Sequence, residues 1–205
     1  TASRIMAGAQ ITVFVGLVAV GIAALVGVPL GILAGMRRGT WADALVMRGA
    51  DLLLAFPALL LAIIAGAVWG PSTLTAMVAI GIAGIPSFAR VARSGTLQVI
   101  TQDYISSARI SAVPGWKVAW RHILPNLAGL LIVQASVYFA LAILAEAGLS
   151  YLGLGTAPPA ASWGRMLQSS QPYLATDPHL ALFPGLAIAI TVLAFNLIGG
   201  GRDPR

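Results

Sequence analysis

Charged residues are scarce in this sequence, and their scarcity excludes most classes of soluble protein. Only 9% of its 205 residues are charged, whereas a soluble globular protein usually carries about 25%. With 59% hydrophobic residues, the chain cannot cover its surface with polar groups in water. We therefore expect an all-α polytopic membrane protein, because each helix satisfies its own backbone hydrogen bonds in lipid. At this length, residues 1–205 are expected to form a single transmembrane domain.

Cysteine is absent and lysine nearly so. Without cysteine there can be no disulfide framework, thiolate metal site or cysteine nucleophile. The single lysine, Lys117, lies between a tryptophan and a valine, whereas a phosphate-binding loop requires Gly-Lys-Ser/Thr. We therefore expect no ATP hydrolysis in this chain. We also expect no metal site, because the two histidines, His122 and His179, are predicted to lie on opposite sides of the membrane.

Five apolar segments are long enough to cross a bilayer, which takes about 20 helical residues. The third of them is interrupted by Gly81, Gly84 and Pro86. Pro57 lies inside the second and predicts a kink there, because proline removes a backbone donor. The five predicted spans cover residues 11–36, 46–69, 73–88, 127–145 and 180–198.

Basic residues are distributed unevenly between the predicted loops. Of the twelve Lys and Arg residues, ten fall in three segments that strict alternation places on one side. Because such residues collect in cytoplasmic loops, these segments are predicted to be cytoplasmic, and residues 148–179 form an external loop. The excess of positive charge is thus explained without a nucleic-acid partner. The ten residues are Arg37, Arg38, Arg48, Arg90, Arg93, Arg109, Lys117, Arg121, Arg202 and Arg205.

Two local patterns predict contacts near the first two spans. Gly27, Gly31 and Gly35 form a smooth face that lets another helix approach closely. That face can pack within this chain or against a partner subunit. Arg48 and Asp51 are three residues apart on one predicted helix and could pair there, as a simple charge pair at the helix end or, less favoured, as part of a substrate site.

The predicted cytoplasmic loop, residues 89–126, is the longest basic segment. It is predicted to hold a short helix over residues 102–112, a break at Pro114-Gly115 and an amphipathic helix over residues 116–123. Two interpretations of this segment remain equal on physical grounds: contact with anionic lipid and docking of a protein. Its exposed side is predicted to carry Arg109, Trp116, Lys117, Trp120, Arg121 and His122.

The stretch from Asp103 to Arg109, followed by Arg121-His122-Ile123-Leu124-Pro125-Asn126, resembles the EAA loop of binding-protein-dependent ABC importer permeases. It is most similar to the dipeptide/oligopeptide/nickel branch, and in particular to the second permease of the pair. The usual Glu-Ala-Ala positions are Ser106-Ser107-Ala108 here, and the usual loop glycine is Ala112. The bend is therefore expected at Pro114-Gly115.

The resemblance extends over nearly the whole chain. It includes Asp51–Pro57, Ala145–Gly155, Trp163-Gly164 and Leu182–Gly185. It implies a type I ABC importer transmembrane fold in the bacterial plasma membrane. Members of the family have a further span before Ser3-Arg4, so we expect five of six spans in this sequence.

The resemblance also implies the partners of the chain. These are a homologous sister permease, two cytoplasmic ATP-binding subunits that hold ATP and Mg, an extracytoplasmic substrate-binding protein and the lipid bilayer. The branch carries dipeptides, oligopeptides, nickel chelates and related solutes. The implied ATPase-coupling residues are Asp103, Tyr104, Ile105, Ser106, Ser107, Ala108, Arg109, Ala112, Gly115, Trp116, Lys117, Arg121 and His122.

Glu146 is an acid near the end of an apolar span, where it either gates the external mouth, contacts the binding protein, or is solvated or capped.

Two other classes of protein are set beside this interpretation. A secondary transporter would use no ATPase. The internal repeats and midplane acids that such a transporter would be expected to show are not evident in the sequence. An intramembrane serine protease would use Ser150 of Gly148-Leu149-Ser150 together with His179, although both are predicted at or outside the external boundary.

Overall fold

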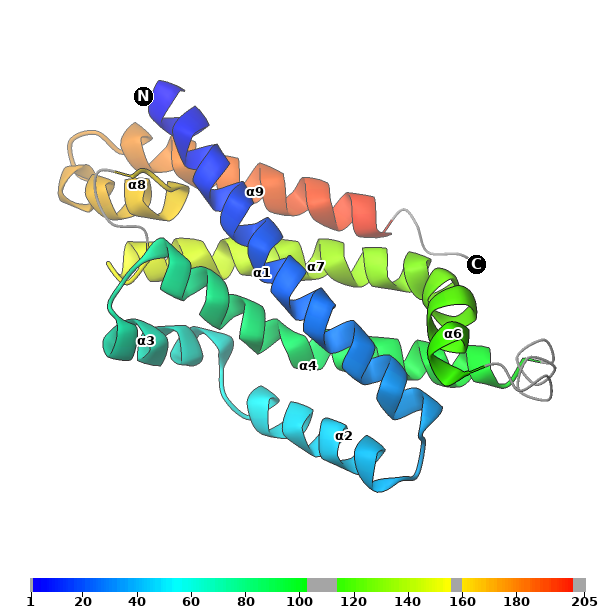
Figure 1. Ribbon diagram of the computed structural model, residues 1–205. Helices are drawn as coiled ribbons and strands as arrows, with labels where there is room; N and C mark the ends of the chain where they lie inside the picture. The colour runs from blue at the N-terminus through cyan, green and yellow to red at the C-terminus, as the bar shows by residue number, and fades with distance from the viewer. Residues whose placement is uncertain (1, 103–113, 156–159, 201–205) are drawn as a thin grey trace.

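The chain folds into a bundle of long helices, shown in Figure 1. The computed structural model describes residues 2–102, 114–155 and 160–200, and no strand occurs within these ranges. The two turn-like elements are a π-helix, η1, and a 3₁₀-helix, η2. The elements in chain order are α1 (Ala2–Met36), α2 (Trp41–Leu54), α3 (Ala58–Trp69), α4 (Thr73–Ile100), α6 (Gly115–Val118), η1 (Ala119–Ile123), α7 (Leu124–Tyr151), α8 (Trp163–Ser170), η2 (Gln171–Tyr173) and α9 (His179–Gly200).

Within the described ranges, four continuous helices are long and apolar enough to cross a membrane. The second predicted span, residues 46–69, is not one kinked helix as expected. It is the pair α2 and α3, bent by 80°, and the five-span prediction holds if this pair counts as one span. The helix ends because Pro57 has no N–H to donate and disfavours helical geometry in the residue before it.

Helix α4 is longer than the sequence predicted. It continues to Ile100 rather than ending near Phe88, so that residues 89–100 of the predicted cytoplasmic loop are helical. Gly84 and Pro86 lie inside this helix because α7 fills the space beside them. The Tyr138 ring packs against Gly84, and its hydroxyl donates a 2.5 Å hydrogen bond to the carbonyl of Ile80.

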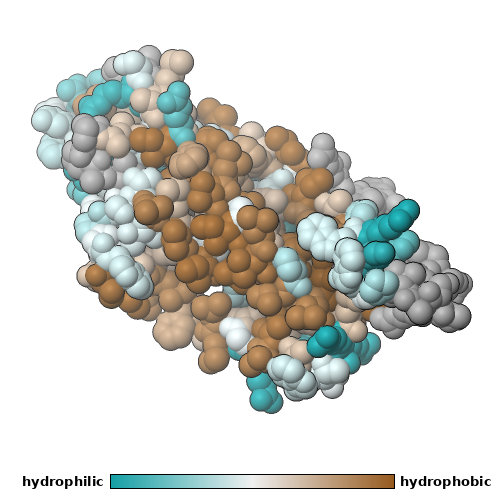
Figure 2. Space-filling view, in the orientation of Figure 1, coloured by the Kyte–Doolittle hydropathy of each residue, from teal (hydrophilic) through white to brown (hydrophobic). Residues whose placement is uncertain are grey.

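The faces of the bundle that point outward are strongly apolar. Leu25, Ile190 and Leu197 are 78%, 64% and 74% exposed, which would be unfavourable in water. Figure 2 shows a broad hydrophobic surface over the middle of the molecule, with hydrophilic residues toward its ends. This distribution matches the hydrocarbon core of a bilayer and its two polar boundaries.

The glycine face of α1 packs within this chain, against α4. A Cβ atom at Gly27 would lie 2.6 Å from the carbonyl oxygen of Ile85, and one at Gly35 would lie 2.7 Å from the side chain of Thr96. A Cβ atom at Gly31, between them, would collide with the carbonyl oxygen of Ala89. Of the two alternatives for this face, internal packing is therefore the one observed.

We predict that Gly31→Ala lowers the stability of the protein in detergent by about 1–3 kcal/mol, because the new methyl group forces α1 and α4 apart. The measurement is the thermal unfolding of the purified protein. Gly21→Ala is the matched control, since nothing lies within 4 Å of a Cβ atom built at Gly21 on the same helix. That change should be neutral or stabilising by up to about 1 kcal/mol. Equal losses in both variants would contradict the packing described.

Candidate functional site

The segment that follows the predicted break at Pro114-Gly115 is the beginning of a very long helix. Residues Gly115–Tyr151 form one helix of 37 residues, made of α6, η1 and α7. The predicted separate helix over residues 116–123 is thus its first two turns. The predicted helix over residues 102–112 lies outside the described residues, apart from Gln102.

The helix continues past Pro125 without a break because the turn that precedes the proline is widened. The N–H of Leu124 donates to the carbonyl of Ala119, five residues back, as in a π-helix. The side-chain amide of Asn126 donates a 2.6 Å hydrogen bond to the carbonyl of His122. These two bonds satisfy backbone groups around a proline that cannot donate.

Five of the predicted coupling residues can be placed. Gly115, Trp116, Lys117 and Arg121 are exposed and His122 is half-buried, so the start of the long helix presents a basic surface. The inner side of the same turns is fixed by Val118 and Ile123, which are 1% and 0% exposed. The remaining predicted coupling residues, Asp103 to Arg109 and Ala112, lie outside the described residues.

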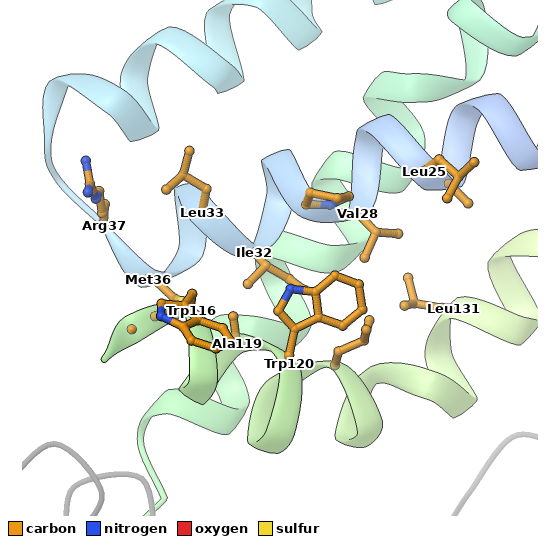
Figure 3. A pocket seen from close by; sticks show the side chains of 14 residues that line it. Leu25, Val28, Ile32, Leu33, Met36, Arg37, Trp116, Ala119, Trp120 and Leu131 are labelled. Atoms are coloured by element: carbon orange, nitrogen blue, oxygen red, sulfur yellow. The ribbon is translucent and has the colours of Figure 1, made fainter. Parts of the chain in front are cut away.

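The two tryptophans of this segment are exposed, as predicted, although they also lie close to α1. Figure 3 shows the rings of Trp116 and Trp120 beside the end of α1, near Met36 and Ile32. The Nζ of Lys117 lies 5.6 Å from the centre of the Trp116 ring, a cation–π distance. Together with α1, the tryptophans line an apolar groove.

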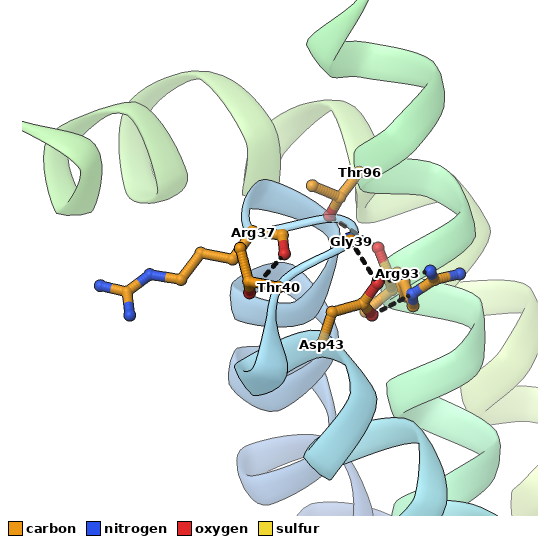
Figure 4. Close-up of polar contacts among 7 residues, drawn as sticks. Arg37, Gly39, Thr40, Asp43, Arg93 and Thr96 are labelled. Carbon is orange, nitrogen blue, oxygen red and sulfur yellow. Dashed lines mark hydrogen bonds and ion pairs between the residues drawn. The ribbon is translucent and has the colours of Figure 1, made fainter.

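A salt bridge joins the first turn of α2 to α4, as Figure 4 shows. Arg93 donates from Nε and Nη2 to the two carboxylate oxygens of Asp43, at 2.7 Å and 2.8 Å. The N–H of Gly39 donates to the same carboxylate at 3.1 Å. Because Gly39 has a φ of 79°, the turn has a conformation that favours glycine. The turn between α1 and α2 is thereby fixed to the last part of α4.

A second, exposed pair joins α2 to α4, between Asp51 and Arg90. The pairing of Asp51 with Arg48 that the sequence allowed on one helix is not the one observed. Neither α2–α4 pair was found from the sequence, because the partners are 39 and 50 residues apart. One feature of the sequence could have indicated these pairs. The two acids of α2 are followed along the chain by a helix that carries two arginines one turn apart.

At the opposite end of the bundle, Glu146 is buried rather than solvated. It is 1% exposed and accepts hydrogen bonds from Ser150, at 2.7 Å, and from Thr12, at 3.5 Å. The backbone N–H of Trp163 in turn donates to Thr12 at 3.4 Å. The carboxylate therefore joins α7 to α1 and, through Thr12, to α8, and it is not accessible to a partner protein in this conformation.

Ser150 and His179, the two residues of the protease alternative, have different surroundings. Ser150 is fully buried and its hydroxyl donates to Glu146. His179 begins α9, with its ring edge-on to Phe183 and its Nε2 4.0 Å from Asp177. Their described contacts explain both residues as parts of the helix packing at this end.

Comparison with known proteins agrees with this architecture. Residues 27–201 match the family described as "Binding-protein-dependent transport system inner membrane component". A glutathione transport system permease protein of Pectobacterium atrosepticum is 43% identical over 98% of this chain and 67% of its own length. A dipeptide transport system permease protein of Alkalihalophilus pseudofirmus is 41% identical over 98% of this chain and 66% of its own length. The chain thus spans about two thirds of the length of these relatives.

The fold is also that of a solved transporter. A chain of the MetNI methionine ABC transporter, in an inward-facing conformation, superimposes with a TM-score of 0.78 over 94% of this chain and 91% of its own. The sequence identity is 18%, so that this likeness concerns the fold.

The long apolar helices, the basic segment between α4 and α7 and the shared fold define an ABC importer permease of type I. The chain belongs to the family of binding-protein-dependent transport system inner membrane components. It is accordingly a multi-pass protein of the bacterial inner membrane.

The Asp43–Arg93 pair is predicted to stabilise the arrangement of α1, α2 and α4. Asp43→Asn should lower stability by about 1–3 kcal/mol, because Arg93 loses a largely buried bidentate partner. Asp51→Asn is the control, since its pair with Arg90 is exposed on both sides and such pairs contribute about 0–1 kcal/mol. Thermal unfolding of both variants in detergent measures the difference. Equal effects would mean that the Asp43 pair does not hold the turn.

Proposed function

We propose that this chain lines the pathway of a peptide, or of a related small solute, through an ATP-driven importer. The proposal for the solute is supported by the relatives, whose names describe the transport of glutathione, dipeptides and peptides. In the proposed assembly the chain pairs with a sister permease, and an external binding protein delivers the solute. ATP hydrolysis, with its Mg, is assigned to two separate cytoplasmic subunits.

The proposed coupling surface is the segment between α4 and α7. Arg109, Lys117 and Arg121 would supply positive charge to the ATPase, and Tyr104 and Ile105 would supply apolar contacts. The remaining positions of the segment, from Asp103 through Ala112 to Gly115 and His122, would shape the contact. Trp116, which is exposed beside the end of α1, would supply a further apolar contact to the ATPase.

The continuity of the helix Gly115–Tyr151 is the observation that carries the mechanism. At 1.5 Å per residue, its 37 residues have a contour length of about 55 Å, with a turn between α6 and α7 (Figure 1). Its first turns carry Lys117 and Arg121, and its last turns carry Glu146 and Ser150. A displacement of the coupling segment would therefore move the opposite end of the bundle, because a packed helix transmits movement as a rigid body.

The coupling surface is tested by Tyr104→Ala and Arg109→Glu in the complete transporter. We expect each to lower ATPase co-purification and solute uptake by about tenfold, as for the loss of about 1.4 kcal/mol at a docking contact. Arg48→Gln is the control, because it changes an arginine of α2 outside the segment. Unchanged docking and uptake in both test variants would remove the segment from the mechanism.

The transmission by the long helix is tested at Gly129, where nothing lies within 4 Å of an added Cβ atom. Gly129→Pro removes a backbone hydrogen bond and kinks the helix, at a cost of about 3 kcal/mol. We expect the ATPase to remain bound and active while uptake falls by about tenfold or more. Gly129→Ala keeps the helix and should behave as the wild type. Normal uptake by a stably assembled Gly129→Pro transporter would refute transmission through this helix.

A further inference from the structure

The groove beside the two tryptophans lies between the last turns of α1 and the beginning of the long helix. It has a volume of about 980 Å³, within the range of about 300–1,000 Å³ that is common for small-molecule sites. Figure 3 shows its walls. Apart from one arginine and the glycine at the start of α6, every lining residue carries an apolar or aromatic side chain. The lining residues are Ala24, Leu25, Val28, Pro29, Ile32, Leu33, Met36, Arg37, Gly115, Trp116, Ala119, Trp120, Leu124 and Leu131.

The length of the groove corresponds to about one leaflet of a bilayer. Along α1 it extends from Ala24 to Arg37, which is about 20 Å at 1.5 Å per residue. One leaflet contributes about 15 Å of hydrocarbon, beyond which the headgroups begin. Among the described residues that line the groove, Arg37 alone is charged and lies at one end, so the described lining is apolar along its length and positive at its mouth.

The charge of Arg37 is not balanced by the acids near it. Asp43 and Asp51 are the acidic residues of α2, and they pair with Arg93 and Arg90 of α4. Within residues 2–102, 114–155 and 160–200, Arg37 therefore has no ion-pair partner. Among the described residues no acid occupies its guanidinium, and basic groups at this depth attract anionic headgroups.

The tryptophans occupy the position that indole rings favour in membrane proteins, at the boundary between hydrocarbon and headgroups. Trp116 and Trp120 are 65% and 67% exposed, although both line the groove. They form its wall opposite Ile32 and Met36 of α1. An apolar chain lying between them would remove the rings from water.

We propose that this groove binds one anionic phospholipid of the leaflet at the basic end of the bundle. One acyl chain lies along α1 from Ala24 toward Arg37, and the headgroup phosphate binds the Arg37 guanidinium. A peptide cargo fits poorly, because the apolar walls offer no partners for its backbone N–H and C=O groups. The proposed ligand is a membrane component, distinct from the solute and from the ATPase, although the groove shares Gly115 and Trp116 with the proposed coupling segment.

The test compares phosphatidylglycerol with phosphatidylcholine of the same acyl chains. The complete transporter is delipidated in detergent, mixed with each lipid, and analysed by native mass spectrometry. We expect the wild type to retain phosphatidylglycerol preferentially. Arg37→Gln should reduce that retention by about fivefold, the contribution of one basic residue near an anionic lipid, and leave phosphatidylcholine unchanged.

Arg38→Gln is the matched control, since Arg38 is the exposed neighbour of Arg37 and does not line the groove. It should retain both lipids as the wild type does. Ala24→Phe narrows the apolar end and should reduce retention of both lipids. Equal effects of the two arginine changes, or no preference in the wild type, would overturn the proposal. A photoreactive residue at position 120 that cross-links the sister permease or the ATPase instead of lipid would also overturn it.

Discussion

Three glycines, spaced one turn apart, bring the backbone of α1 directly against α4. At Gly31 even a methyl group would meet the carbonyl oxygen of Ala89. This contact determines where the two helices end relative to each other. It places Gly39 and Asp43, just after α1, beside Arg93 near the end of α4. A wider spacing between α1 and α4 would separate Asp43 from Arg93. The salt bridge, the turn that it fixes and the wall of the groove formed by α1 therefore depend on this close approach.

The long helix is then held at both ends by different kinds of interaction. Near its beginning, Val118 and Ile123 pack into the core formed with α1 and α4. Near its end, a buried carboxylate and two hydroxyl groups connect it to α1 and α8. Apolar packing tolerates small rotations, whereas a buried hydrogen-bonded carboxylate has few alternative partners. The end at Glu146 is thus the more rigid attachment of this helix.

Much of the fold follows from the sequence alone, because runs of apolar residues and the asymmetry of arginines depend only on local composition. The resemblance in residues 103–126 predicted the family, which the comparisons confirm. The extension of α4 through Pro86 could not be predicted, since it depends on Tyr138, about fifty residues later in the chain. The burial of Glu146 was missed for a similar reason. Its partners Thr12 and Trp163 come from other helices, and only the packing of α1, α7 and α8 reveals them.

The break between α2 and α3 has a consequence for how the chain sits among lipids. A break in a helix interrupts the regular backbone hydrogen bonds between its two parts, and hydrocarbon tails offer no replacement donors. Irregular backbone at membrane depth persists only where protein or water covers it. Phe56 is 51% exposed among the described residues, so helices of the described ranges do not cover the break fully. We therefore expect the flank that carries this break to face protein or water rather than bulk lipid.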